Sequence, residues 1–275
     1  MSAIADGLRL ESVPRPGRRP ASFWRFEGAP APGTGRAPLL AVHGLGVDGR
    51  FFRHLGPLAR DRDLVLVNLP NDLPAGATMD DLADEALSAL DAAGHGAARA
   101  VVLGSSFGGM VALAVALARP GRTAGLVLVG TAGAWADVPL HLRFLARVHP
   151  LVPRLPYPRV LAALMLPPVF SVADPAAREE LRVQMLHRTK GFVGGAIGAM
   201  RGFDARGRLG GVAAPTLVVH GGADHIFPER TGRALAAAIP GARFVGIPSC
   251  GHLPPFTHPG DTCRAVESFL REASL

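Results

Sequence analysis

The sequence is poor in several residue types, and each shortage excludes a class of protein. Its 275 residues include two cysteines and one lysine, Lys190. Two cysteines are too few for a zinc site of the usual spacings. We expect Cys250 and Cys263 to be reduced thiols, and a disulfide closing a short C-terminal loop is the alternative. Arginine is used in place of lysine throughout, which we interpret as a compositional bias and not as a sign of function.

Long apolar runs are also missing. No stretch approaches the roughly 20 uninterrupted apolar residues that a membrane-spanning helix needs. The first 20 residues are polar, with an arginine- and proline-rich stretch at 15–20, and lack the apolar core of a secretion signal. We therefore expect no membrane span and a cytoplasmic protein.

The positive charge is not concentrated in one place. The net charge is +7, but the arginines are scattered, and only Arg15, Arg18 and Arg19 form a short run. A nucleic-acid-binding protein would cluster its charge in a recognisable motif, so no nucleic-acid partner is expected. With 48% apolar and 19% charged residues the composition is globular. The length suits one large domain or one domain with an insertion.

Short runs rich in valine and leucine recur along the chain. Each is apolar on both faces, as in a parallel strand covered by helices on both sides. The predicted strands are 38–42, 63–69, 100–104, 125–130, 215–220 and 242–247, with an antiparallel edge strand at 22–27. Because helical patterns separate these runs, the sequence predicts an α/β fold with a mostly parallel sheet.

Four helices are predicted between and after these strands. Residues 79–93 form an amphipathic pattern with Thr78 as the N-cap. Residues 107–118 are apolar nearly all round, which predicts a buried helix. The other two predicted helices span 229–239 and 261–273.

Residues 134–209 break the alternation, because they contain no strand pattern and many prolines. We interpret them as an all-helical cap inserted into a core made of residues 1–133 and 210–275. An extra packing layer without a binding role is the alternative. The cap is apolar, which favours a hydrophobic acyl or aromatic group as ligand. Its apolar residues include Leu142, Phe144, Leu145, Leu161, Leu164, Met165 and Phe170.

The cap also carries four arginines. They are Arg143, Arg147, Arg154 and Arg159. They form either a solvated outer face or a dock for an anionic acyl carrier.

The strongest chemical signal is the segment Gly104-Ser105-Ser106-Phe107-Gly108. It lies where a predicted strand ends and a buried helix begins, which is the context of a G-x-S-x-G nucleophile elbow. A sharp turn there lifts the Ser106 hydroxyl off the sheet, and the glycines leave room for it. The sequence predicts Ser106 as a nucleophile.

A serine hydroxyl needs a base, and the base needs an orienting acid. Asp224 follows the strand at 215–220 and His252 follows the strand at 242–247. The carboxyl ends of parallel strands share one edge of a sheet, where ligands of α/β proteins bind. We predict His252 as the general base and Asp224 as the acid. Asp137 is the alternative acid, and the competing histidines are His220, His225 and His258.

From about Leu39 onward the chain resembles the α/β-hydrolase superfamily. The matching pieces are His43-Gly44-Leu45-Gly46, the elbow at Ser106, Gly221-Gly222-Ala223-Asp224 and Gly251-His252. The resemblance implies an oxyanion hole formed by the backbone N–H groups of Leu45 and Phe107, and it identifies the insertion as the family's helical cap. It implies a serine hydrolase of the esterase kind that needs no metal or organic cofactor.

Several other functions use the same fold or the same motifs. An acyltransferase, a thioesterase or a C–C bond hydrolase would keep the Ser-His-Asp set, and a binding protein would keep the fold alone. Residues 44–49 also satisfy G-x-G-x-x-G after a strand, a dinucleotide-binding pattern. That interpretation requires an acidic residue at the end of the next strand, and the chain has Asn68-Leu69-Pro70 there. We therefore favour hydrolysis of a carboxylic ester or thioester with a small hydrophobic group.

Overall fold

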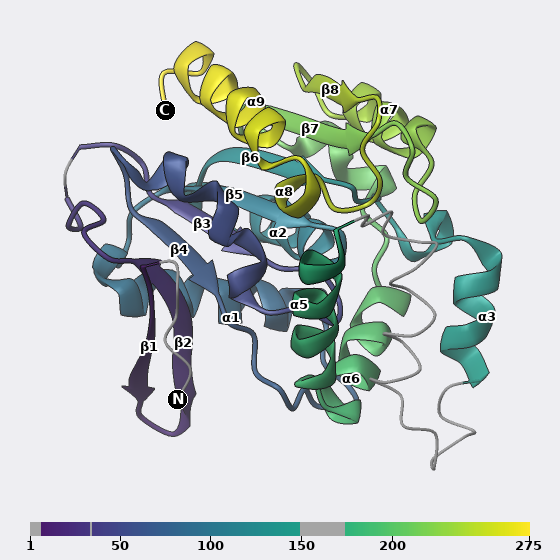
Figure 1. Ribbon diagram of the computed structural model, residues 1–275, viewed down its shortest axis with the longest axis horizontal. Helices are drawn as coiled ribbons and strands as arrows, with labels where there is room; N and C mark the ends of the chain where they lie inside the picture. The colour runs from purple at the N-terminus through teal and green to yellow at the C-terminus, as the bar shows by residue number, and fades with distance from the viewer. Residues whose placement is uncertain (1–6, 34, 149–173) are drawn as a thin grey trace.

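The structure, a computed structural model, describes residues 7–33, 35–148 and 174–275. Eight strands form one sheet in the order β1-β2-β4-β3-β5-β6-β7-β8. The strands from β4 to β8 in this order are parallel, and β1 and β2 form an antiparallel hairpin at one end (Figure 1). The strands are β1 (Leu8–Arg15), β2 (Arg18–Phe26), β3 (Leu39–Val42), β4 (Leu64–Val67), β5 (Ala100–Ser105), β6 (Thr123–Val129), β7 (Thr216–Gly221) and β8 (Arg243–Ile247). The predicted α/β fold with a mostly parallel sheet is confirmed.

Helices cover both faces of the sheet. Side chains alternate between the two faces along a strand, so β3 sends Leu40 and Val42 into one core cluster and Leu39 and Ala41 into the other. The first cluster contains the buried sides of α1 (Met79–Leu90), α2 (Phe107–Ala118) and α7 (Glu229–Ala238). The second contains those of the 3₁₀ segment η1 (Gly49–Ala59), α8 (Pro254–Thr257) and α9 (Pro259–Glu272). This burial on both faces explains why the central strands are continuously apolar.

The predicted helices are present with small changes at their ends. Thr78 caps α1, and it forms a reciprocal capping box with Asp81. The helical pattern expected to continue to residue 93 changes to a π-helical turn, η2 (Asp91–His95). The buried helix α2 has its predicted bounds, and Pro120 starts a short turn, η3 (Pro120–Arg122), immediately after it.

The N-terminal hairpin differs from the prediction. Residues 22–27 were expected to form the edge strand, but β2 lies between β1 and β4, so β1 is the edge. Most residues of β1 are at least partly exposed, and its sequence, LRLESVPR, contains arginine and proline. Because such a strand lacks the continuous apolar character of a buried one, its pattern did not distinguish it from a polar terminus.

The regular elements in the described part of 134–209 are helical segments joined by short loops, with one isolated bridge between Ala134 and Asp204. Residues 149–173 lie outside the described part, and with them Arg154, Arg159, Leu161, Leu164, Met165 and Phe170. The helical elements are η4 (Trp135–Asp137), α3 (Leu140–Val148), α5 (Pro175–Leu186), α6 (Lys190–Arg201) and η6 (Arg206–Gly211). The boundaries of the cap stay a prediction.

Two further features bear on the sequence predictions. Cys250 and Cys263 are both buried and free, so the alternative of a disulfide between them is wrong for this structure. Across the described residues, no helix combines the length and apolar character needed to cross a membrane.

Candidate functional site

Ser106 lies in a strained turn between β5 and α2. Its φ is 54° and its ψ is −120°, a left-handed backbone conformation that residues other than glycine rarely adopt. A Cβ on Gly104 would collide with the carbonyl of Gly108, and a Cβ on Gly108 would collide with the carbonyl of Val42. Glycine is therefore required at both positions, and the turn presents the Ser106 side chain above the end of the sheet, as expected for a nucleophile elbow.

The turn is held by hydrogen bonds on both sides of Ser106. Its N–H donates to Val129 O at 2.8 Å, and its carbonyl accepts from Gly109 N at 2.9 Å. The same carbonyl accepts from Thr131 Oγ1 at 2.6 Å. Because these partners belong to β6, α2 and the loop after β6, packing of the sheet and helix maintains the strained conformation.

His252 and Asp224 lie beside this turn, as the sequence analysis expected. His252 Nε2 is 2.9 Å from Ser106 Oγ, and His252 Nδ1 is 2.8 Å from Asp224 Oδ2. Asp224 and His252 are buried, with exposed fractions of 5% and 2%. The structure thus brings the three predicted residues into one hydrogen-bonded chain, and their catalytic roles stay a prediction.

The carboxylate of Asp224 is oriented by its own loop. Its Oδ1 accepts from the backbone N–H groups of Ile226 at 2.8 Å and Phe227 at 3.0 Å, which leaves Oδ2 for His252. Burial alone would raise the pKa of Asp224, but the charge and hydrogen bond of His252, together with His220 and the Phe227 N–H, lower it overall. The carboxylate is therefore ionised at neutral pH and can orient the imidazole.

The loops that carry Asp224 and His252 are bonded to each other. Gly222 N donates to Ile247 O and Ala223 N donates to Cys250 O, both at 2.9 Å. Gly130, at the end of β6, lies directly beneath the pair, since a Cβ there would be 3.6 Å from His252 Nδ1 and 3.7 Å from Asp224 Oδ2. Its φ of 52° also favours glycine. No motif in the sequence pointed to this glycine.

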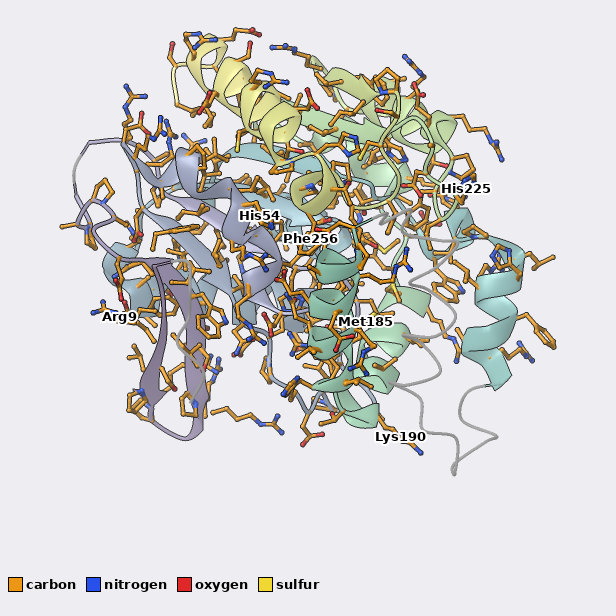
Figure 2. The ribbon with its side chains drawn as sticks, viewed as in Figure 1. Arg9, His54, Met185, Lys190, His225 and Phe256 are labelled. Atoms are coloured by element: carbon orange, nitrogen blue, oxygen red, sulfur yellow. The ribbon has the colours of Figure 1, made fainter. Side chains whose placement is uncertain are left out.

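Three of the alternative candidates for the acid and the base lie outside this hydrogen-bonded chain. Asp137 accepts from Ala134 N at 3.0 Å and so closes a local turn. His225 is exposed at the molecular surface (Figure 2). His258 Nδ1 lies 3.0 Å from its neighbour Thr257 Oγ1.

His220, expected to be a histidine of the strand end, is buried beside the acid. Its Nε2 lies 3.4 Å from Asp224 Oδ2 and donates to Phe227 O at 2.7 Å. His220 lies at the end of the strand, as predicted, but no feature of the sequence indicated its proximity to Asp224.

The loop after β3 passes against the nucleophile turn. A Cβ on Gly44 would be 3.5 Å from both Ser105 O and Ser106 Cβ. Leu45, half-buried, follows Gly44, and Phe107 is the first residue of α2. Phe107 is therefore the chain neighbour of Ser106, and Leu45 follows a residue that lies against Ser106; their role as oxyanion donors stays a prediction. The proposed dinucleotide pattern at 44–49 instead leads into η1, with Asp48 as its N-cap.

Residues 39–266 match the model of the alpha/beta hydrolase family. The chain belongs to the α/β-hydrolase family. This assignment confirms the predicted resemblance and the expectation of an enzyme of this family, and it replaces the dinucleotide interpretation.

Family members with esterase and hydrolase names are similar to most of the chain. A RutD protein of Pseudomonas savastanoi pv. phaseolicola, assigned as a carbamate hydrolase, is 32% identical over 85% of this chain and 94% of its own length. The pimeloyl-[acyl-carrier protein] methyl ester esterase of Edwardsiella ictaluri is 29% identical over 93% of this chain and 99% of its own length. A solved thermophilic esterase from Thermogutta terrifontis is 27% identical, with a TM-score of 0.80 over 96% of this chain and 99% of that one.

A much longer relative also matches this hydrolase. The polyketide synthase ThaQ of Burkholderia thailandensis is 35% identical over 86% of this chain, and the chain spans 12% of its length. The chain thus corresponds to a small part of this relative.

Proposed function

We propose that this chain is a serine hydrolase that cleaves a carboxylic ester or thioester with a small hydrophobic group. The observation that supports the proposal is the continuous set of hydrogen bonds from Asp224 through His252 to Ser106, 2.8 and 2.9 Å long. Ser106 is the nucleophile, His252 the general base and acid, and Asp224 the group that orients the imidazole.

In the first half of the reaction, His252 Nε2 removes the Ser106 proton as Oγ attacks the substrate carbonyl carbon. The carbonyl oxygen becomes negatively charged in a tetrahedral intermediate. The imidazolium then gives its proton to the leaving oxygen or sulfur as the bond to the carbonyl carbon breaks. An alcohol or thiol departs, and an acyl ester remains on Ser106.

In the second half, water takes the place of the leaving group. His252 removes a proton from the water as its oxygen attacks the acyl carbon, and it returns that proton to Ser106 Oγ as the acyl bond breaks. Asp224 stabilises the imidazolium in both halves through its ionised carboxylate. A carboxylic acid is released and the enzyme is restored.

The negative oxygen of each intermediate needs donors beside Ser106. The N–H groups of Leu45 and Phe107 fill this role in the proposal. Phe107 begins α2, and the N-terminus of a helix favours developing negative charge. The close contact between Gly44 and Ser106 supports the placement of Leu45.

Apolar surface on the predicted cap supports a hydrophobic acyl group. On α3, Phe144 is 62% exposed and Leu142 packs against the core, so the described part of the predicted cap offers apolar surface. The pimeloyl-[acyl-carrier protein] methyl ester esterase relative supports an acyl group borne on a carrier as a second candidate substrate. Arg147 is exposed on the same helix and would face an anionic carrier.

The deciding experiment uses a fluorophosphonate probe on the parent protein and on two serine variants. We expect the probe to label the parent and Ser105→Ala, and not Ser106→Ala. Ser105 is a matched control because it precedes Ser106, is 1% exposed and has no hydrogen-bond partner for its hydroxyl among the described residues. Ester turnover should fall on the order of a million-fold in Ser106→Ala alone. Label on the Ser106→Ala variant would contradict the proposal.

A substrate panel separates the remaining alternatives. Ester, thioester and β-diketone substrates distinguish an esterase from a thioesterase and a C–C bond hydrolase, and added alcohols or amines reveal acyl transfer. A protein that binds without turnover would not be labelled. For a carrier-borne substrate, activity should fall with ionic strength, while activity on a neutral ester should not.

A further inference from the structure

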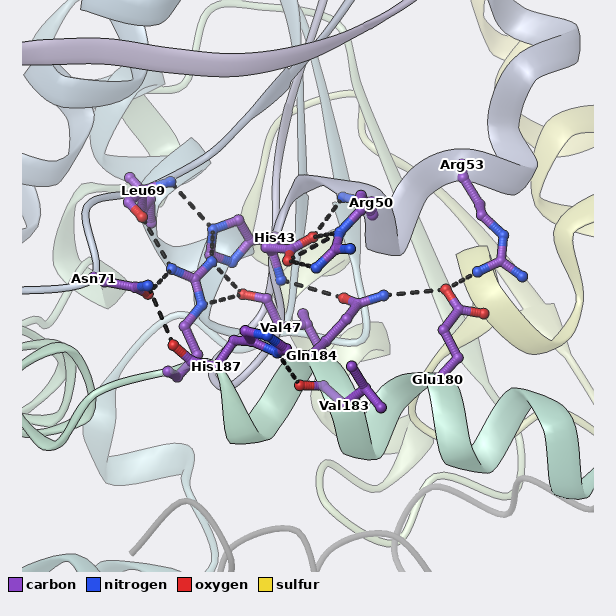
Figure 3. A network of polar contacts seen from close by, with 12 residues as sticks. His43, Val47, Arg50, Arg53, Leu69, Asn71, Glu180, Val183, Gln184 and His187 are labelled. Atoms are coloured by element: carbon purple, nitrogen blue, oxygen red, sulfur yellow. Dashed lines mark hydrogen bonds and ion pairs between the residues drawn. The ribbon is translucent and has the colours of Figure 1, made fainter. Parts of the chain in front are cut away.

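The turn between α5 and α6 sends a charged side chain into the core. Arg188 is 3% exposed, and it is hydrogen-bonded to the loop that follows β3; Figure 3 draws the network around the labelled His43 and Val47. Its pKa is lowered to about 10 by burial, so it remains charged at neutral pH. A buried arginine normally requires compensating partners. The surroundings of Arg188 supply them from residues of the loops after β3 and β4.

All five N–H groups of the guanidinium are used. Nε and Nη2 donate to Val47 O at 2.8 and 2.6 Å, and Nη1 donates to Leu69 O at 3.0 Å and Asn71 Oδ1 at 2.8 Å. The second proton of Nη2 points to His43 Nε2 at 3.0 Å. A guanidinium has five donors in a fixed planar fork, so its position determines the positions of these acceptors. Each acceptor is an uncharged group.

A side chain from α5 itself holds the other end of the same peptide bond. Gln184 Oε1 accepts from Asp48 N at 3.3 Å, while Arg188 binds the Val47 carbonyl. Val47 C=O and Asp48 N–H belong to one peptide unit. Two side chains four residues apart in the sequence therefore fix the orientation of that unit, and Figure 3 draws the contacts of the labelled Val47 and Gln184.

Arg188 also contributes to the choice of which nitrogen of His43 carries the proton. Arginine only donates, so His43 Nε2 must accept, and Leu69 N donates to the same atom at 3.4 Å. The proton then lies on Nδ1, which is 2.9 Å from the Gly44 carbonyl and donates to it. Burial, and then the charge of Arg188, lower the pKa of His43 to about 3, so the ring is neutral at physiological pH.

The Gly44 carbonyl and the Leu45 N–H form one planar peptide group. In a trans peptide the two point in opposite directions, so fixing the carbonyl fixes the direction of the N–H. The Leu45 N–H is the proposed oxyanion donor, and Gly44 lies against Ser106. The chain of contacts thus runs from Arg188 through His43 and Gly44 to the donor.

We infer that Arg188 is a positioning residue, which aligns the Leu45 N–H with the developing oxyanion by selecting the Nδ1–H tautomer of His43 and clamping the 47–48 peptide. The inference rests on the proposed function. Arg188 does not touch the reacting atoms. Its substitution should therefore weaken binding of the transition state while substrate binding changes little.

The kinetic test compares Arg188→Met, Arg188→Lys and the control Arg182→Met on a short 4-nitrophenyl ester. Arg182 lies nearby on α5, but it is 47% exposed and pairs with Glu179. Loss of a single oxyanion donor lowers kcat by about a hundred- to a thousandfold. Because Arg188→Met should misalign the Leu45 N–H without removing it, we expect kcat to fall by roughly ten- to a hundredfold and KM to stay within about twofold of the parent. Arg188→Lys should recover only part of the loss because an ammonium cannot reproduce the fork. Arg182→Met should match the parent.

The second test reads the tautomer of His43 directly from the ¹⁵N chemical shifts of its ring. In the parent protein we expect the proton on Nδ1, and in Arg188→Met a mixture with the Nε2–H form. The parent measurement needs no variant, so it can overturn the inference even where Arg188→Met fails to fold. A parent ring protonated on Nε2, or an Arg188→Met variant with parental kcat, would overturn the inference.

The two proposals fail in different ways. If the fluorophosphonate probe does not label Ser106 in the parent, the proposed function fails, whatever the tautomer of His43. If Ser106 is labelled and Arg188→Met changes KM alone or nothing, the function stands and the role of Arg188 is wrong.

Discussion

His220 lies 3.4 Å from Asp224, measured from Nε2 to Oδ2, and the same nitrogen donates to Phe227 O at 2.7 Å. Phe227 N in turn donates to Asp224 Oδ1 at 3.0 Å. His220 therefore secures the loop that orients the acid. Burial lowers the pKa of His220, so the neutral ring supplies this hydrogen bond at physiological pH.

Replacing His220 should mainly lower the stability of the protein, with a smaller effect on ester turnover. In His220→Leu the buried Phe227 carbonyl loses its donor, which should lower the free energy of unfolding by about 1–3 kcal/mol. His220→Gln keeps an N–H near the same place and should lose less. Denaturant unfolding and ester kinetics measure both effects. His225→Ala, at an exposed neighbour of the acid, should change neither, and an equal loss there would show that the whole loop is merely sensitive to substitution.

Asp224→Asn should lower ester turnover by about ten-thousand-fold, because an amide favours the wrong histidine tautomer and cannot stabilise the imidazolium. Asp137→Asn is the control. Its carboxylate accepts from Ala134 N in a local turn, so activity should stay near that of the parent. The kcat/KM of both variants on one ester settles the comparison. A larger loss in Asp137→Asn would place the acid after β6 instead.

Gly130→Ala should reduce both stability and turnover. Its φ of 52° is strained for alanine, which should lower the free energy of unfolding by about 1 kcal/mol or more. Its new methyl group would also lie only 3.0 Å from the backbone oxygen of His252, which should shift the His252 backbone, and the imidazole with it, and lower kcat.

Gly241 offers a matched control for that displacement. It has a φ of 68°, but a Cβ there would meet nothing within 4 Å. Gly241→Ala should therefore lose stability and keep its kcat. If Gly130→Ala had the kcat of the parent, the contact of its methyl group with His252 would have no effect on the reaction.

Both thiols should resist alkylation in the native state. Burial raises the pKa values of Cys250 and Cys263 from 9.0 to about 11. The thiolate is the reactive form. At about pH 8 a rise of two pKa units cuts the thiolate fraction about a hundredfold. Iodoacetamide labelling followed by mass spectrometry should show slow modification in the native protein and rapid modification in denaturant. Fast native labelling of either cysteine would contradict the burial of these residues.

The residues of the candidate triad could be found because local sequence carries their signals. The elbow is a run of five residues with glycines that the backbone contacts demand, and it lies between a strand and a helix that periodicity alone predicts. Asp224 and His252 follow apolar strands, so parallel topology places them at the same edge as Ser106.

The supporting residues carried no such signal. Arg188 lies 145 residues from His43 in sequence and belongs to a segment without a motif. His220 looked like an ordinary strand-end residue, and Gly130 was one glycine among 34. Their roles depend on which loops pack together, which is not encoded by spacing along one segment.

The sequence by itself determined the α/β alternation, the turn at Ser106 and the order of the predicted nucleophile, acid and base, because each depends on local periodicity or on backbone sterics within a few residues. The tertiary structure decided that β1 and not β2 is the edge strand, that His252 reaches Ser106 and Asp224 at hydrogen-bond distance, and that Arg188 bonds to the loop after β3. These facts depend on contacts between residues far apart in the chain. Such contacts form only when the sheet order and the packing of the inserted helices bring those residues together.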